Sequence, residues 1–223
     1  MRILQLSDTH NQHARLTELP EADVVVHCGD FTENGTEEEV LDFLNWFAGL
    51  PYPHKLFVTG NHDLCLWDAE GIEDLPDGMH FLQDHGCVID GVRFFGLAYN
   101  HPESLIPDGV DVLLTHEPPV MLLDKSAGTH WGNAPLRRRV LEVKPRYHLF
   151  GHAHEAWGVM KMEDVVFSNG ALADNCNRPP APVVCLMMSG QMYFYSSASC
   201  VCCRIVFPLC CTFRVALSPI VTT

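Results

Sequence analysis

Short segments rich in Asp, His, Asn and Gly recur along the chain, each directly after an apolar run. They are Ser7-Asp8-Thr9-His10, Gly29-Asp30, Gly60-Asn61-His62-Asp63, Thr115-His116 and Gly151-His152-Ala153-His154. Imidazole ligands suit Zn, Fe or Ni, and carboxylate or amide oxygens suit Mn or Mg, so this set favours a borderline divalent metal. The segments hold no thiolate, which argues against a closed structural zinc site. A carboxylate shared between two ions about 3.5–4 Å apart would make a two-metal hydrolase.

The apolar runs before these segments predict buried strands that must position them. The expected strands are Ile3–Leu6, Val24–His27, Leu56–Val58, Val92–Leu97, Val112–Thr115, His148–Phe150, Val165–Ser168 and Val183–Met187. In α/β sheets, ligands bind beyond the carboxyl ends of the strands, so loops far apart in sequence can converge there.

Two amphipathic segments predict helices between the strands. The first begins with a capping box formed by Thr36 and Glu39, continues through Val40, Leu44 and Phe47, and stops at Gly49. The second covers 134–143, with one proline in its first turn and another just beyond its end. Strands that alternate with helices favour a layered α/β fold.

Composition limits the classes of partner. The 223 residues carry 14 basic and 28 acidic side chains, a net charge of −14, which disfavours stable binding to nucleic acid or an anionic membrane. The first eight residues contain no signal-peptide core, so we expect a cytoplasmic protein with reduced cysteines. Residues 189–223 form a Cys-rich apolar tail, too interrupted for a transmembrane helix, and we expect the catalytic domain to end at 188.

Taken in order, the five motifs resemble the calcineurin-like metallophosphoesterase superfamily. Further stretches, Gly29–Glu33, Val112–Pro119 and Lys144–His152, are similar to the small metallophosphoesterase-domain-containing subgroup. The resemblance covers residues 1 to about 188. It implies a four-layer αββα sandwich, in which two mixed β-sheets are flanked by helices.

The resemblance also implies a role for each motif residue. One divalent ion would be held by Asp8, His10, Asp30 and His154, and a second by Asp30, Asn61, His116 and His152. The ions would be Mn²⁺ or Fe²⁺/Zn²⁺. A metal-bridging hydroxide would attack a phosphomonoester or phosphodiester in line, with a nucleotide or cyclic nucleotide among the candidate substrates. His62 would protonate the leaving oxygen and contact substrate together with Asn61, while Asp63 would orient or tune His62.

Several positions leave alternatives open. Some members of the subgroup carry Gly in place of His152, which weakens the second metal, whereas this chain keeps His. Glu117 stands where a small residue is usual, and Asn133 where a cysteine is expected. His130 is a candidate substrate contact because it lies in a glycine-flanked loop. A catalytically weak metal- or nucleotide-binding regulator is the alternative to an enzyme, and a nuclease is disfavoured by charge. The oligomeric state stays open.

Overall fold

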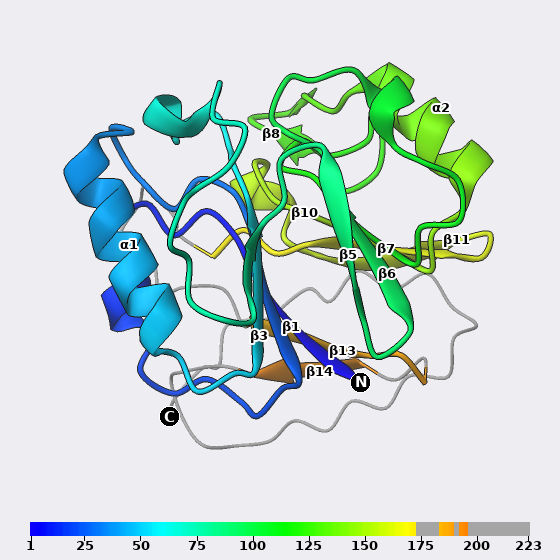
Figure 1. Cartoon of the computed structure of the whole chain (residues 1–223). Coiled ribbons are helices and arrows are strands. Elements are labelled where there is room, and N and C mark those ends of the chain that lie inside the picture. The colour runs from blue at the N-terminus through cyan, green and yellow to red at the C-terminus, as the bar shows by residue number, and fades with distance from the viewer. Residues whose placement is uncertain (173–182, 190–191, 196–223) are drawn as a thin grey trace, which may run out of the picture.

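Two six-stranded sheets contain most of the strands in the computed structural model, which describes residues 1–172, 183–189 and 192–195 (Figure 1). The strands of the first sheet are β1 (Arg2–Leu6), β2 (Val24–Cys28), β3 (His54–Val58), β4 (Met79–Phe81), β13 (Val183–Met187) and β14 (Met192–Tyr195). Those of the second are β5 (His85–Ile89), β6 (Val92–Gly96), β7 (Val112–Leu114), β10 (Tyr147–Phe150), β11 (Gly158–Met162) and β12 (Val165–Asn169). The strands β8 (Lys125–Ser126) and β9 (Thr129–His130) form a separate hairpin.

Both sheets are mixed. The first has the order β14-β13-β1-β2-β3-β4. Strands β1 to β4 run parallel, and β13 pairs antiparallel with both of its neighbours, β1 and β14. The second has the order β11-β12-β10-β7-β6-β5, with four parallel strands between antiparallel β11 and β5. The parallel strands therefore present their carboxyl ends along a common edge of each sheet.

Three apolar cores show that the sheets and helices form four layers. Ile3 and Val24 of the first sheet share a core with Val112 and Leu149 of the second, so this core lies between the sheets. Alternate residues of the strands point the other way, as the two-residue period of a strand requires. Leu4 belongs to a second core, with helix α1.

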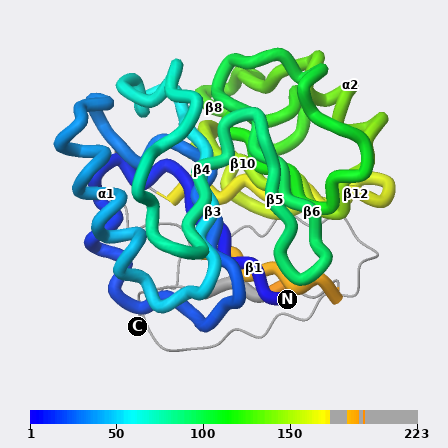
Figure 2. The backbone as a smooth tube through the Cα atoms, viewed as in Figure 1, coloured from blue at the N-terminus to red at the C-terminus, as the bar shows by residue number. Residues whose placement is uncertain are grey.

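The second core packs α1 (Glu37–Gly49) on the first sheet through Val40, Phe43 and Phe47. A third core packs α2 (Ala134–Val143) on the second sheet through Leu136 and Val140. The two helices lie on opposite sides of the pair of sheets (Figure 2). The order of layers is helix, sheet, sheet, helix, which confirms the expected αββα sandwich.

The eight expected strands and both expected helices are present, with ends that differ by no more than two residues. The capping box of α1 is formed, because Thr36 accepts from the Glu39 backbone N–H and the Glu39 carboxylate accepts from the Thr36 N–H. The sequence analysis did not find β4, β5, β8, β9, β11 or β14. β4 and the hairpin strands are very short, and the side chains of β5 and β11 are mostly exposed or half-buried, so they lack a clear apolar run.

The expected domain boundary at residue 188 falls inside the first sheet, because β14 follows it and pairs with β13. Residues 196–223, which contain the five clustered cysteines of the predicted tail, lie outside the described residues. Within the described part of the chain, none of the helices has the length and apolar character needed to span a membrane.

Candidate metal centre

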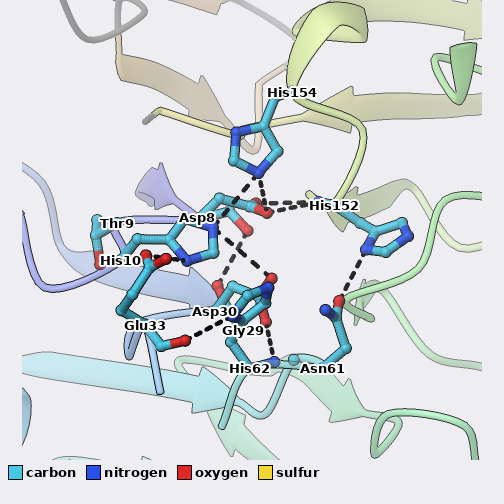
Figure 3. Close-up of polar contacts among 12 residues, drawn as sticks. Asp8, Thr9, His10, Gly29, Asp30, Glu33, Asn61, His62, His152 and His154 are labelled. Carbon is cyan, nitrogen blue, oxygen red and sulfur yellow. Dashed lines mark hydrogen bonds and ion pairs between the residues drawn. The ribbon is translucent and has the colours of Figure 1, made fainter. Parts of the chain in front are cut away.

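All five motifs follow parallel strands. The loops that carry Asp8, Asp30, Asn61 and His152 meet at the carboxyl edge of the two sheets (Figure 3), and His116 joins them through its contact with Asn61. The loop backbones are unusual, since Asp8, His10, Asp30 and His152 all have positive φ, between 41° and 67°. This left-handed conformation is disfavoured for residues with a Cβ and clusters at functional sites in proteins. The fold therefore holds these side chains in strained loops that bring them together.

Asp8, His10 and His154 form one group of potential ligands, in which the donor atoms lie within 4.8 Å of one another. His154 Nε2 lies 3.3 Å from Asp8 Oδ1 and 3.4 Å from His10 Nε2. The β10 loop is attached to this group, because the His152 N–H donates to both Asp8 oxygens at 3.0 Å. Two imidazoles and a carboxylate around one point are suitable ligands for a borderline divalent ion.

Asp30, His116 and His152 form a second group with the same spacing. His116 Nε2 lies 3.3 Å from Asp30 Oδ2 and 2.9 Å from Asn61 Oδ1, and His152 Nδ1 lies 2.9 Å from the same amide oxygen. Asp30 Oδ2 also lies 3.8 Å from His10 Nε2, which belongs to the first group. Asp30 is therefore placed between the two groups.

Backbone carbonyls fix the orientation of two of these imidazoles. His10 Nδ1 faces the Thr32 carbonyl at 3.2 Å, and His116 Nδ1 faces the Cys28 carbonyl at 2.9 Å. A carbonyl only accepts, so each Nδ1 carries a proton and each Nε2 faces the site. Such outer contacts orient metal-binding histidines in proteins. The donor set thus fits two borderline divalent cations, one in each group.

Two glycines are required by the close approach of the loops. A Cβ on Gly60 would collide with Oδ1 of Asp30, and a Cβ on Gly151 would collide with a carboxylate oxygen of Asp8. Each glycine directly precedes a candidate ligand in the sequence, Asn61 or His152. Any larger residue would push the candidate ligand loop away from the carboxylate.

Burial lowers the pKa of histidines in the site, whereas neighbouring carboxylates raise it. Burial lowers the pKa of His10, and lowers that of His152 to about 4, so both are neutral at pH 7. His116 is also buried, but the Asp30 and Asp8 carboxylates raise its pKa to about 10. Burial opposes ionisation of Asp8, yet its contacts with His154 and His116 hold its pKa below the usual range. A metal bound at His116 would displace its proton.

His62 lies close to the metal ligands, in a third donor group with His10 and Asp30. Its backbone N–H donates to Asp30 Oδ1 at 2.8 Å, and its ring meets the His10 ring edge-on at a centroid distance of 4.8 Å. His62 Nδ1 donates to the Glu33 carbonyl at 2.7 Å. The Glu33 carbonyl therefore orients the ring, and Nε2 is the ring nitrogen that does not take part in this hydrogen bond.

The structure directs the Asp63 carboxylate toward backbone N–H groups of the neighbouring loops, so its predicted action on His62 stays a prediction. Asp63 is fully buried and accepts from the backbone N–H groups of Asp30, Gly60 and Thr32 at 2.8, 2.8 and 3.0 Å. The Thr32 hydroxyl also donates to it, at 2.8 Å. Burial, with the charge of Asp30, raises the pKa of Asp63 to about 6. Asp63 joins the loops after β2 and β3 and so positions Asp30.

His130 lies in the β8–β9 hairpin, next to the loop that carries His154. The hairpin is attached there by a 2.8 Å hydrogen bond from the Ala127 N–H to Glu155. His130 Nδ1 contacts Asp124 Oδ1 at 2.6 Å, and Asp124 itself is only 1% exposed. The dyad leaves Nε2 of a 38% exposed imidazole available. The sequence analysis found His130 but not Asp124.

Glu117 and Asn133 contact each other at the edge of the site. Asn133 Nδ2 donates to Glu117 Oε2 at 3.3 Å, while Asn133 Oδ1 accepts from the Leu136 N–H and caps α2. Glu117 is half-buried and belongs to neither donor group. The N-cap role could have been predicted, because Asn133 directly precedes the Ala-Pro start of α2.

Trp67 and Tyr99 also border the site, and the sequence analysis did not single them out. The Tyr99 ring meets the His116 ring at 5.9 Å, and Trp67 Nε1 donates to the Gly60 carbonyl at 2.9 Å. Each is an isolated aromatic residue in a loop, so only the three-dimensional structure reveals its position.

Comparisons with known proteins show which sequences and structures this chain is similar to. The family model described as calcineurin-like phosphoesterase matches residues 1–156. The chain is 36% identical to a UPF0046 protein of Caenorhabditis elegans over 209 residues, which cover 80% of this chain and 71% of the relative. It is 32% identical to human metallophosphoesterase domain-containing protein 1, with 82% of this chain and 69% of the relative covered.

Solved structures with similar folds include TT1561 of Thermus thermophilus, with a TM-score of 0.60 and 11% identity over 87% of this chain and 98% of that one. A structure described as a novel archaeal phosphodiesterase has a TM-score of 0.54 and 19% identity, with 88% of this chain and 99% of that chain covered. At these identities the likeness concerns the fold alone.

Proposed function

Because the chain belongs to the calcineurin-like phosphoesterase family, we propose that it is a dinuclear metal-dependent phosphoesterase. Its substrate would be a small phosphomonoester or phosphodiester, with nucleotides and cyclic nucleotides among the candidates. The observation that carries the proposal is the position of Asp30 between two groups of metal-binding side chains. A cytoplasmic location, and Mn²⁺ or Fe²⁺/Zn²⁺ as the ions, belong to the same proposal.

The two groups define which residues would hold each ion. Asp8, His10 and His154 would bind one, Asn61, His116 and His152 the other, and Asp30 would contact both. When bound, two divalent ions would supply positive charge for the phosphoryl oxygens and would lower the pKa of an attacking water toward about 7.

The other residues would handle the substrate. His62, oriented by the Glu33 carbonyl, would donate a proton from Nε2 to the leaving oxygen, and its Nδ1–H would stay bonded to that carbonyl. Asp63 would keep Asp30 in place through the hydrogen bond to its N–H. His130 would offer Nε2 to a substrate oxygen from the side of His154, and Asp124 would hold its ring.

The test is hydrolysis of 4-nitrophenyl phosphate and bis(4-nitrophenyl) phosphate by full-length protein with Mn²⁺, Fe²⁺, Zn²⁺ or Mg²⁺. We expect turnover with at least one ester, and His62→Ala should reduce it by about 10²–10⁴-fold, the range for a general acid. Metal content should be unchanged in this variant. A loss of bound metal in His62→Ala would instead make His62 a ligand.

The alternative, a metal- or nucleotide-binding regulator, gives a different result. It predicts metal uptake and thermal stabilisation by nucleotides without turnover of either ester. Glu117 is hydrogen-bonded to Asn133 at the edge of the site. Burial raises the pKa of Tyr99, and the charge of Glu117 adds to this effect. If wild-type protein is inactive, turnover by Glu117→Gly would identify this carboxylate as the group that prevents catalysis.

A further inference from the structure

Two aromatic side chains lie beside the donor group that contains Asn61 and His116. Trp67 follows the short helix η2 (Leu64–Leu66), and Tyr99 lies in the loop after β6. Their ring centroids are 5.5 Å apart with a tilt of 37°. Tyr99 contacts the His116 ring, and Trp67 donates a hydrogen bond to Gly60, which directly precedes Asn61. The pair is therefore attached to the candidate metal centre at two points.

Part of this aromatic pair is exposed to solvent. Trp67 is 38% exposed, although its only polar group, Nε1–H, already donates to the Gly60 carbonyl. Tyr99 is half-buried, and among the described residues its hydroxyl has no hydrogen-bond partner in the protein. Exposed aromatic surface next to a hydroxyl without a protein partner resembles the sites where proteins stack planar groups of ligands.

The aromatic pair lies where the organic group of a bound phosphate ester would extend. A phosphate bound between the two donor groups would lie near Asp30 and His116. The organic group of the ester must then extend from this point across an edge of the site. On the side of His116, that edge is formed by Tyr99 and Trp67.

We propose that Trp67 and Tyr99 form the stacking surface for a planar aromatic group of the substrate, namely a nucleobase. The pair would make the chain select nucleoside phosphates over aliphatic phosphate esters. This inference rests on the proposed function for the placement of the phosphate, but it concerns a different property, the preference for the organic group. Removing one stacking aromatic side chain weakens the binding of a base by about 5- to 150-fold.

Binding of AMP and of ribose 5-phosphate isolates the contribution of the base. Both affinities are measured by calorimetry on full-length protein with Mn²⁺ and with His62→Ala present throughout, which slows hydrolysis of the two monoesters during the titration. The chain with no other change serves as the wild type and is compared with Trp67→Ala, Trp67→Phe, Tyr99→Ala and Trp131→Ala. Trp131 is the matched control, because it is 60% exposed and its Nε1 also donates to a backbone carbonyl, that of Ser126. It lies in the segment that follows the β8–β9 hairpin, which packs beside the His154 loop.

We expect wild-type protein to bind AMP more tightly than ribose 5-phosphate. Trp67→Ala and Tyr99→Ala should lose about 5- to 150-fold in AMP affinity and keep their affinity for ribose 5-phosphate. Trp67→Phe should keep most of the preference for AMP, because a phenyl ring still stacks. AMP should quench tryptophan fluorescence in the wild type and quench it less in Trp67→Phe.

Three results would overturn the inference. Equal binding of AMP and ribose 5-phosphate by the wild type, including failure to bind either, would show that the base is not recognised. An equal loss for both ligands in Trp67→Ala and Trp67→Phe would mean that Trp67 acts only through its bond to Gly60. Loss of the AMP preference in Trp131→Ala alone would place the base at the other edge. An AMP preference that depends on Trp67 in a protein without hydrolysis would contradict the proposed function and support this inference.

Discussion

The Asp63 carboxylate accepts from the backbone N–H groups of Asp30, Thr32 and Gly60, and Asp63→Ala would leave all three without a partner. A buried donor that loses its acceptor costs about 1–3 kcal/mol, so three could cost about 3–9 kcal/mol. Water can enter the space, and the repulsion between Asp63 and Asp30 disappears, so we expect a loss near the lower end. The predicted destabilisation is about 3–4 kcal/mol.

The variant should also bind metal less well. The Asp30 N–H is one of the three donors, and Asp30 lies between both groups of ligands. Loss of an outer contact of this kind typically reduces metal affinity by about 10–100-fold. Urea unfolding of metal-free protein and Mn²⁺ titration measure the two effects separately. Asp68→Ala is the control, since Asp68 is exposed and its replacement should stay within about 0.5 kcal/mol.

The opposite result would support the role first expected for Asp63. If Asp63→Ala unfolds within about 1 kcal/mol of the wild type, keeps its Mn²⁺ affinity and loses turnover, Asp63 acts on the chemistry. The hydrogen bonds to Asp30, Thr32 and Gly60 would then be dispensable for the site.

Two further predictions concern packing and pH. Gly60→Ala should lower Mn²⁺ affinity by about 10-fold or more because its Cβ would displace Asp30, whereas Gly71→Ala, with open space around it, should leave the affinity unchanged; equal affinities in a titration would contradict this. Burial lowers the pKa of His148 to about 3, and the unfolded chain has the ordinary value of about 6.5, so the unfolded state binds the extra proton as pH falls from about 6.5 to about 3. The stability that depends on neutral His148 is therefore fully present above about pH 6.5. Urea unfolding should show that the free energy of unfolding falls between pH 7 and pH 5 by about 2 kcal/mol less in His148→Gln than in the wild type. An equal fall in both proteins would contradict this.

The clustering of the candidate ligands could be predicted from the sequence, because these residue types come directly after predicted strands. Asp8, Asp30, Asn61, His116 and His152 all follow apolar runs that form parallel strands, and such strands end at one edge of a sheet. The order of layers could not be derived from the runs alone, since nothing in a single strand says which sheet it joins. It came from the family resemblance.

Other features depend on contacts that no local pattern records. Asp63 follows His62 in the chain, which suggested that the two act together, but its carboxylate turns to the loop after β2. Tyr99 and Trp67 come from separate loops and meet only when β3, β6 and β7 are in place. The edge strand β5 was missed because most of its side chains face solvent, so it has no apolar run.

Metal stoichiometry tests the shared position of Asp30 most directly. Elemental analysis of full-length protein equilibrated with Mn²⁺ should give two ions per chain, one for each donor group. His154→Ala should retain one ion, because the group around His116 is intact. Asp30→Asn should lose affinity at both positions. A single ion in the wild type, or an Asp30→Asn variant that still binds two ions as tightly as the wild type, would contradict the account.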